Sequence, residues 1–132
     1  MTTTTTWTDD ELDRIEQAEE LDIASLRRSG TLSSRRTIWV VRVGDDIYVR
    51  SVYGPGSDWY RGTRARHEGR IEAEGVTKDV SFVDVADEID DEEINEAVDA
   101  SYRRKYAHYA ASIIEAITSD TASSTTLRLL PR

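Results

Sequence analysis

Ten of the 17 basic residues of this 132-residue chain lie between Ser25 and Arg70, and all ten are arginines. Only four acidic residues accompany them in that stretch, although the whole chain has a formal net charge of −9. Because a guanidinium group can bind phosphate or carboxylate through two parallel hydrogen bonds, this clustering indicates an anion site. Two of the three tryptophans and three of the six tyrosines lie in the same stretch. We therefore predict a site for a small anionic ligand with a flat aromatic ring.

A simpler interpretation remains open, since runs of charge are often only the solvated face of a protein. The chain contains 15 arginines and only two lysines, a ratio that also fits a GC-rich or salt-adapted genome. A GC-rich genome would explain the preference for arginine over lysine, but it would not explain why the arginines cluster.

The candidate anion-binding side chains fall into two short segments. The first places two hydroxyl groups and two guanidinium groups before a β-prone run, and its residues are Ser33, Ser34, Arg35, Arg36 and Thr37. The second is Arg50 with Ser51, late in the next predicted strand. An arginine within an apolar strand must either reach solvent or find an anion, because an unpaired buried charge is costly. That anion is either a ligand or an acidic residue on a neighbouring strand, and Trp39 is likewise either a core residue or a ring contact.

Conventional catalytic and metal-binding motifs are absent from the sequence. His67 and His108 lie far apart and belong to no spaced ligand set, and the chain has no cysteine. Ser33 and Ser34 lack the context of a serine nucleophile, and there is no glycine-rich phosphate loop. We therefore predict no catalytic side chain and no metal ligand.

The bulk properties narrow the class of protein and its partners. A sequence pI near 4.7 argues against nucleic acid and anionic membranes as partners. No apolar run approaches the ~20 residues that span a bilayer, and no secretory signal is evident, so we expect a cytoplasmic protein. Residues 1–6, mostly threonine, are expected to form a disordered leader, and residues 7–132 a single domain.

The local patterns predict a mainly β chain with flanking helices. Thr8 and Glu11 form a capping box that begins a helix ending near residue 20, and Trp7 can pack against its first turn. Predicted strands cover residues 21–26, 38–43, 47–53, 70–73, 76–85 and 125–130, with a short helical turn at 58–66. Apolar residues at helical spacing predict a long helical segment over residues 94–118. Hairpins dominate over βαβ units, so the strands should form an antiparallel sheet or small barrel.

Several of these segments resemble a bacterial family of unknown function in the flavin-binding split-barrel superfamily. The resemblance covers nearly the whole chain, and its marks are the hairpin at residues 38–51, the Gly54–Gly56 break, Trp59-Tyr60-Arg61, the strand beginning Gly69-Arg70-Ile71, and the tail at residues 126–129. The chain also resembles pyridoxamine-phosphate oxidase-like proteins and, more closely, deazaflavin-dependent nitroreductases.

This resemblance implies a six-stranded antiparallel split β-barrel, with the N-terminal helix and the long C-terminal helical segment packed on it. It also implies a homodimer with FMN or a deazaflavin in a groove. Arg35, Arg36 and Arg50 would then hold the phosphate. Ser34 and Ser51 would donate hydrogen bonds, and Trp59 and Tyr60 would form the wall against the ring. Ser33 and Thr37 would complete the segment that binds the phosphate.

Three functions remain open from the sequence. The first is a flavin- or deazaflavin-dependent oxidoreductase that transfers hydride to a small oxidised substrate. The second is a non-catalytic split-barrel protein that binds or senses a flavin, haem or similar anion. The third is a structural dimer or interaction protein without a cofactor, in which the arginines pair across an interface with the acidic residues between Asp84 and Asp99.

Overall fold

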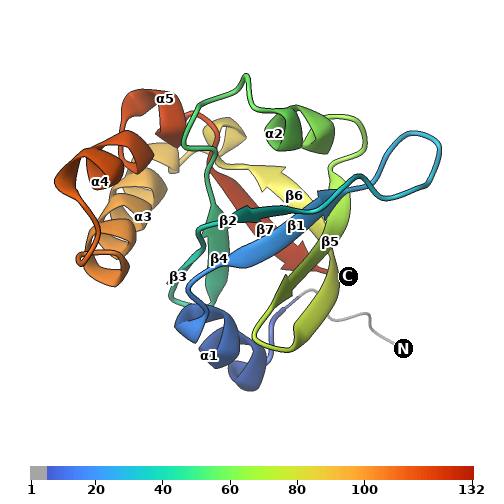
Figure 1. The fold of residues 1–132 in the computed structure, drawn as a ribbon, viewed down its shortest axis with the longest axis horizontal. Helices are drawn as coiled ribbons and strands as arrows, with labels where there is room; N and C mark the ends of the chain where they lie inside the picture. Colours follow the sequence, from blue (N-terminus) through green and yellow to red (C-terminus); the bar gives the residue numbers. More distant parts are fainter. Residues whose placement is uncertain (1–5) are drawn as a thin grey trace.

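The computed structural model describes residues 6–132 and shows a curled antiparallel sheet flanked by helices (Figure 1). The strands are β1 (Leu21–Ser25), β2 (Arg36–Ile38), β3 (Val41–Val43), β4 (Asp46–Val49), β5 (Glu68–Ala73), β6 (Val76–Asp84) and β7 (Leu127–Pro131). The helices are α1 (Asp9–Gln17), α2 (Asp58–Thr63), α3 (Asp91–Lys105), α4 (Ala111–Ile117) and α5 (Asp120–Ser123), with a 3-10 turn at Val85–Asp87.

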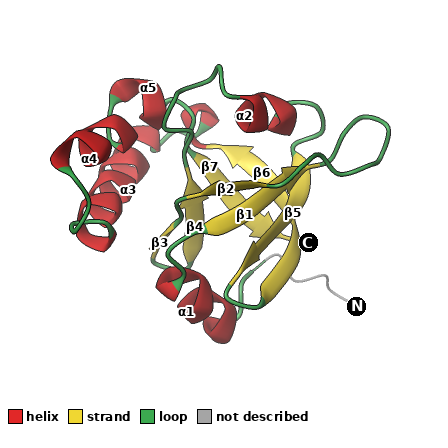
Figure 2. Ribbon diagram, viewed as in Figure 1, coloured by secondary structure: helices red, strands yellow, loops and turns green. Residues whose placement is uncertain are grey.

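The seven strands form one sheet in the order β2-β1-β5-β6-β7-β4-β3. The two edge strands, β2 and β3, are consecutive in the chain and are separated only by Trp39 and Val40. The sheet must therefore curl until its edges approach each other, as the strands in Figure 2 do. This is the predicted antiparallel split barrel, with seven strands in place of six.

The extra strand arises because the run predicted as one strand over residues 38–43 is interrupted at Val40. Side chains of α3 take the backbone groups of Val40 that a continuous strand would use. Its N–H donates to the Tyr106 hydroxyl at 3.1 Å, and its carbonyl accepts from Lys105 Nζ at 2.8 Å. The first part of the run therefore pairs with β1 and the second part with β4.

The predicted hairpin around Gly75 is confirmed, since β5 and β6 pair in register from Glu68↔Ser81 to Ala73↔Val76. The capping box at Thr8 is also confirmed, with the Glu11 N–H donating to Thr8 Oγ1 at 3.1 Å. The predicted long helix is instead two helices, because α3 ends at Lys105 and α4 begins at Ala111. The intervening turn directs Tyr109 back toward the segment after α1, where its hydroxyl contacts Glu19.

Two apolar clusters hold these elements together. The larger fills the curled sheet beneath α1 and includes Leu12, Ile15, Ile47, Phe82 and Leu129. Trp7 belongs to this cluster and donates from Nε1 to the carbonyl of Leu129 at 3.0 Å, so it is a structural residue. The smaller cluster packs α3 against β3 and β4.

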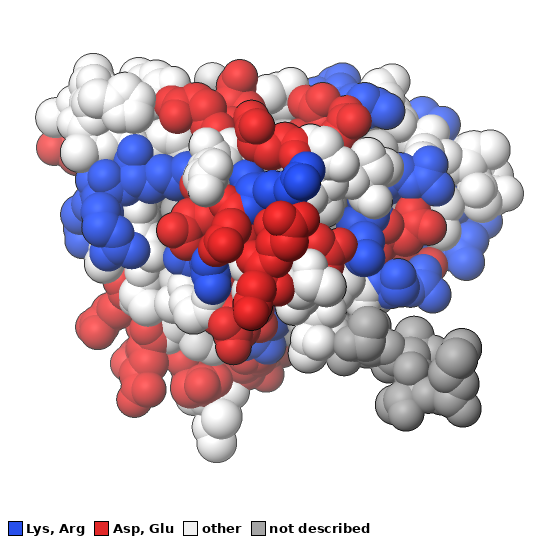
Figure 3. Space-filling view, turned by 90° about the horizontal axis from the view of Figure 1, so that it is seen from below, with Lys and Arg blue, Asp and Glu red and all other residues white. Residues whose placement is uncertain are grey.

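Negative charge gathers at the end of the molecule that carries α1. The first turn of α1 holds three acidic residues, and acidic side chains cover the middle of the face seen from below in Figure 3. Among the described residues, no helix is long and apolar enough to cross a membrane. The first five residues of the predicted leader lie outside the part of the chain that the structure describes.

Candidate functional site

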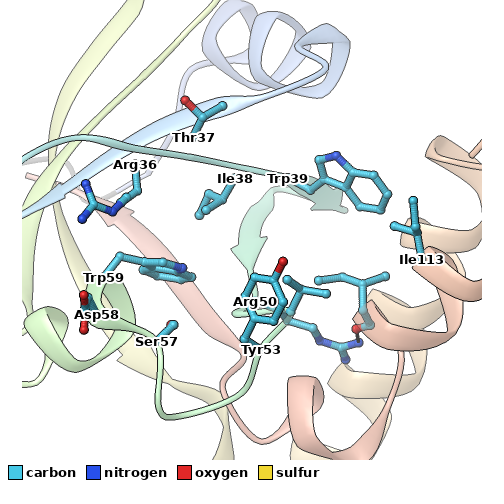
Figure 4. Close-up of a pocket in the computed structure, with 12 residues that line it drawn as sticks. Arg36, Thr37, Ile38, Trp39, Arg50, Tyr53, Ser57, Asp58, Trp59 and Ile113 are labelled. Carbon is cyan, nitrogen blue, oxygen red and sulfur yellow. Dashed lines mark hydrogen bonds between the residues drawn. The ribbon is translucent and has the colours of Figure 1, made fainter.

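A cavity of about 450 Å³ opens between the β2–β3 junction, the segment that follows β4, and α4. Its walls are mostly apolar and aromatic, and these residues are Ile38, Trp39, Val52, Tyr53, Trp59, Ile113 and Ile117. In Figure 4, Trp39 and Trp59 lie on different sides of this space, and Tyr53 lies between them. Volume and lining match those of pockets that bind small aromatic ligands, for which about 300–1,000 Å³ is typical.

A second cavity of about 300 Å³ adjoins the first, since Arg36, Asp58 and Trp59 line both. Its lining is polar and basic, and its other residues are Ser25, Arg27, Arg28, Ser33, Ser34, Gly62 and Ala65. The two cavities together form one groove, with an aromatic end and an arginine end. We call it the barrel groove.

Eight of the ten arginines of the 25–70 stretch fall into two groups. Five of them form ion pairs, and these are Arg35, Arg42, Arg50, Arg64 and Arg70. By contrast, Arg27, Arg28 and Arg36 line the barrel groove and have no carboxylate partner among residues 6–132. Arg27 donates only to the carbonyl of Leu32 at 2.9 Å, and Arg36 only to that of Arg35 at 3.4 Å. These three guanidinium groups are available to an anionic ligand.

Arg50 has a different role from the phosphate contact expected of it. Its side chain is fully buried and ion-paired with Asp99 on α3. Nη2 donates to Asn95 Oδ1 at 3.0 Å, Nη1 to the carbonyl of Ile117 at 3.1 Å, and Nε to Thr126 Oγ1 at 2.9 Å. Every guanidinium nitrogen is therefore used inside the protein. Arg50 lines part of the cavity. Its guanidinium connects the residue that follows β4 with α3, with the end of α4 and with Thr126, just before β7.

Arg35 and Thr37 direct their polar groups away from the arginine end of the groove. Successive residues of a strand point to opposite faces, so Arg35 and Thr37 alternate with Arg36. Arg35 Nη1 bonds Glu72 Oε1 at 3.1 Å, and Thr37 Oγ1 donates to Asp22 Oδ1 at 2.8 Å. Thr37 still lines the aromatic cavity, whereas Arg35 belongs to a separate small cavity on the other face.

The remaining predicted residues divide between ligand wall and scaffold. Trp59 lines both cavities. Tyr60 is buried in the core and meets Trp59 edge-on at 6.1 Å between ring centroids, so it supports the wall from behind. Ser51 braces the loop, donating from Oγ to the Gly54 carbonyl at 2.7 Å. Ser33 and Ser34 lie at the arginine end.

The sequence did not single out several groove residues. Arg27 and Arg28 belong to the arginine cluster but were not among the predicted ligand-binding residues. Asp58, the only acidic residue that lines the groove, begins α2 and has no ion pair within the described residues. Tyr53 and Ile113 were visible only as apolar residues, and the structure places both at the cavity with exposed side chains.

Neither histidine lines the groove or joins a metal site. His67 Nε2 lies 3.3 Å from Asp84 Oδ2, and His108 Nε2 lies 3.2 Å from Glu19 Oε1. Across residues 6–132, no group of three or more His, Cys, Asp or Glu side chains is arranged to hold a metal ion. Burial raises the pKa of Tyr60, which keeps its hydroxyl protonated behind the wall.

The curled antiparallel sheet leaves a groove between its split edges and the helices. The chain belongs to the family described as uncharacterized proteins conserved in bacteria (DUF2255), whose sequence profile matches residues 11–129. No curated protein sequence matches the chain.

Solved structures of the same fold are similar to the chain over most of its length. The conserved hypothetical protein Rv2991 from Mycobacterium tuberculosis has a TM-score of 0.61 at 11% identity, covering 100% of this chain and 84% of its own. An FAD-binding protein from Mesorhizobium loti has a TM-score of 0.57 at 14% identity, covering 96% and 91%. An F420 reductase has a TM-score of 0.51 at 11% identity, covering 91% and 90%. At these identities the likeness establishes the fold.

Proposed function

We propose that the barrel groove binds a flavin-type cofactor, FMN or a deazaflavin, with its ring at the aromatic end and its phosphate at the arginine end. The observation that carries this proposal is the junction of the two cavities. An aromatic-lined space of about 450 Å³ continues into a space bordered by three guanidinium groups that have no carboxylate partner among the described residues. Two structural neighbours, an FAD-binding protein and an F420 reductase, are consistent with such a ligand.

The residues of the groove fit the parts of such a molecule in order. Trp39 and Trp59 offer aromatic faces to a ring system, for which stacked or edge contacts contribute about 0.5–1.5 kcal/mol beyond buried area. Asp58 lies where the two cavities meet, and its carboxylate can accept hydrogen bonds from the hydroxyl groups between ring and phosphate. Arg28 and Arg36 then bind the phosphate through charged hydrogen bonds, each contributing about 1.5–3 kcal/mol.

We further propose that the protein is an oxidoreductase acting on a small oxidised substrate. A bound flavin or deazaflavin supplies the hydride-transfer chemistry, and the protein supplies position and electrostatics. The side chains of the groove need only hold the ring and the substrate together and exclude water from between them. A mechanism without a catalytic acid or base agrees with the lining of the groove. Among the described residues, Asp58 is the only acidic residue in that lining, and no histidine belongs to it.

The same lining also favours a second candidate, a non-catalytic protein that binds or senses a flavin. A sensor needs to bind its ligand but needs no acid or base. Among the described residues, the groove offers arginine and aromatic side chains for binding and a single acidic side chain, that of Asp58. In either case we expect a homodimer, because Tyr53 and Ile113 expose apolar surface at the cavity rim that a second copy could cover. Sedimentation equilibrium measures this directly, and a strictly monomeric protein would contradict it.

Fluorescence titration of the purified protein with FMN, riboflavin and a deazaflavin cofactor tests the binding proposal. We expect quenching of tryptophan fluorescence by FMN or the deazaflavin, and weaker quenching by riboflavin, because riboflavin lacks the phosphate. Reduction of a nitroaromatic dye by the loaded protein and an external reductant then separates the two functions. Turnover supports the oxidoreductase, binding without turnover supports the sensor, and absence of binding contradicts both.

A further inference from the structure

Three aromatic rings in contact connect the barrel groove with an exposed carboxylate. Trp39 lines the cavity and stacks on Tyr106, with ring centroids 3.9 Å apart and planes inclined by 4°. Trp39 also contacts Tyr109, at 4.8 Å between centroids. The Tyr109 hydroxyl donates to Glu19 Oε1 at 2.7 Å, and this carboxylate is exposed. Ring contact is thus continuous from the cavity to a carboxylate at the surface.

Tyr106 and Tyr109, the two tyrosines in this series of rings, differ in how well their surroundings stabilise an oxidised side chain. A tyrosine that loses an electron becomes strongly acidic, so its oxidation is easiest where a base accepts the phenolic proton. The hydroxyl of Tyr106 donates only to backbone carbonyls, those of Glu19 at 2.8 Å and Val40 at 3.1 Å. The Lys105 ammonium also lies 5.3 Å from the Tyr106 ring centroid, where it opposes positive charge on that ring.

Tyr109 has the opposite surroundings. Its hydroxyl faces the Glu19 carboxylate, which can take the proton, and the negative charge of that carboxylate favours loss of an electron from the ring. The hydrogen bond to Glu19 is the main reason why the pKa of Tyr109 is raised, so the phenol keeps its proton until it is oxidised. Oxidation reaching the aromatic chain therefore comes to rest on Tyr109.

We propose that Trp39, Tyr106 and Tyr109 form a relay that carries a one-electron oxidising equivalent from the cavity to the surface. Trp39 loses one electron to a one-electron oxidant in the cavity. Tyr109 returns one electron to the Trp39 radical cation through the ring contacts, and its phenolic proton passes to Glu19. In sum, the oxidant gains one electron, Tyr109 becomes a neutral tyrosyl radical, and the Glu19 carboxylate becomes a carboxylic acid.

The relay would move a one-electron oxidising equivalent formed in the groove to Tyr109. The ligand and the side chains that line the groove would then not be oxidised. Its physiological use rests on the proposed function, because it requires a redox-active aromatic ligand next to Trp39. The relay itself is a property of the protein and can be tested without that ligand.

Pulse radiolysis with the azide radical tests the relay in the ligand-free full-length protein. This soluble oxidant converts tryptophan to its radical, and visible absorbance then follows electron transfer from tyrosine to that radical. We expect a first-order phase, independent of protein concentration, in which tryptophanyl absorbance falls as tyrosyl absorbance rises. Trp39→Phe and Tyr109→Phe should each abolish this phase, and Glu19→Gln should slow it by removing the proton acceptor.

Trp59→Phe is the matched control, since Trp59 lies in the same cavity but its ring contact among the described residues is with Tyr60, edge-on, next to the Arg64 guanidinium. This variant should retain the fast phase. Survival of the fast phase in Tyr109→Phe would overturn the relay, as would its survival in Trp39→Phe. Near-ultraviolet circular dichroism confirms that each variant is folded. Because the oxidant is made in solution, the outcome is independent of whether the groove binds a flavin.

Discussion

Replacement of Arg36 by alanine isolates the contact between the barrel groove and the phosphate of its ligand. Arg36 lines both cavities, and its guanidinium has no carboxylate partner among the described residues. A charged hydrogen bond contributes about 1.5–3 kcal/mol, and the exposure of Arg36 places its contribution at the lower end because solvent screens the charge. About 1.4 kcal/mol corresponds to a tenfold change in Kd, so we expect Arg36→Ala to weaken FMN binding by about tenfold.

The assay is a fluorescence titration with FMN and with riboflavin, at low and at high salt. Riboflavin lacks the phosphate, so its affinity should hardly respond to the substitution. The loss for FMN should shrink as salt screens the interaction. Arg28→Ala should act in the same way, and the double variant should lose about the sum of the two free energies if both residues bind the phosphate independently.

Arg35→Ala provides the matched control, because Arg35 is adjacent in sequence but pairs with Glu72 on the other face of the strand. It should leave the affinity for FMN unchanged. Equal losses in Arg35→Ala and Arg36→Ala would refute the assignment, since they would show that only the overall charge matters. An Arg36→Ala variant that binds FMN as tightly as the wild type would also refute it.

Three further substitutions test the scaffold. Arg50→Met should lower the free energy of unfolding by about 1–3 kcal/mol, because it leaves the partly buried Asp99 carboxylate and the Asn95 side-chain oxygen without their partner; a wild-type urea midpoint would contradict this. Gly69→Ala should cost about 1–3 kcal/mol, since a Cβ there would strike the backbone of the neighbouring strand and lie 2.8 Å from the ring of Phe82, whereas Gly56→Ala, with nothing within 4 Å, should be neutral. Burial lowers the pKa of Lys105 to about 8, below the unfolded value of 10.5. Between those pH values the folded state binds fewer protons than the unfolded state, so the free energy of unfolding should rise with pH from about 8 to about 10. Urea unfolding should show this rise in the wild type and in Lys78→Met but not in Lys105→Met, and an unchanged slope in Lys105→Met would disprove the assignment.

Local sequence patterns were sufficient for the elements whose hydrogen bonds are satisfied locally. The capping box at Thr8 and the β5–β6 hairpin follow from residues a few positions apart, and both appear as predicted. The division of the 38–43 run was not predictable in this way. It depends on Lys105 and Tyr106, more than 60 residues further on, which bind the backbone of Val40.

The same distinction explains the candidate site. The arginine cluster contains five arginines that pair with acids and three others that line the groove. Whether an arginine forms an ion pair or lines the groove depends on residues that are distant in the sequence. Arg50 meets Asp99 and Arg64 meets Asp84, so part of the predicted pairing with the 84–99 segment occurs within a single chain. Composition could not separate these residues from Arg27, Arg28 and Arg36.

Indole N–H resonances offer the most direct test of the claim that the barrel groove binds a flavin. The protein has three tryptophans, and Trp39 and Trp59 line the cavity, while Trp7 is buried in the core with its Nε1–H bonded to Leu129. During a titration with FMN followed by ¹⁵N–¹H correlation spectra, we expect the resonances of Trp39 and Trp59 to shift together while that of Trp7 stays in place. Unchanged resonances for Trp39 and Trp59 at saturating FMN would contradict the claim.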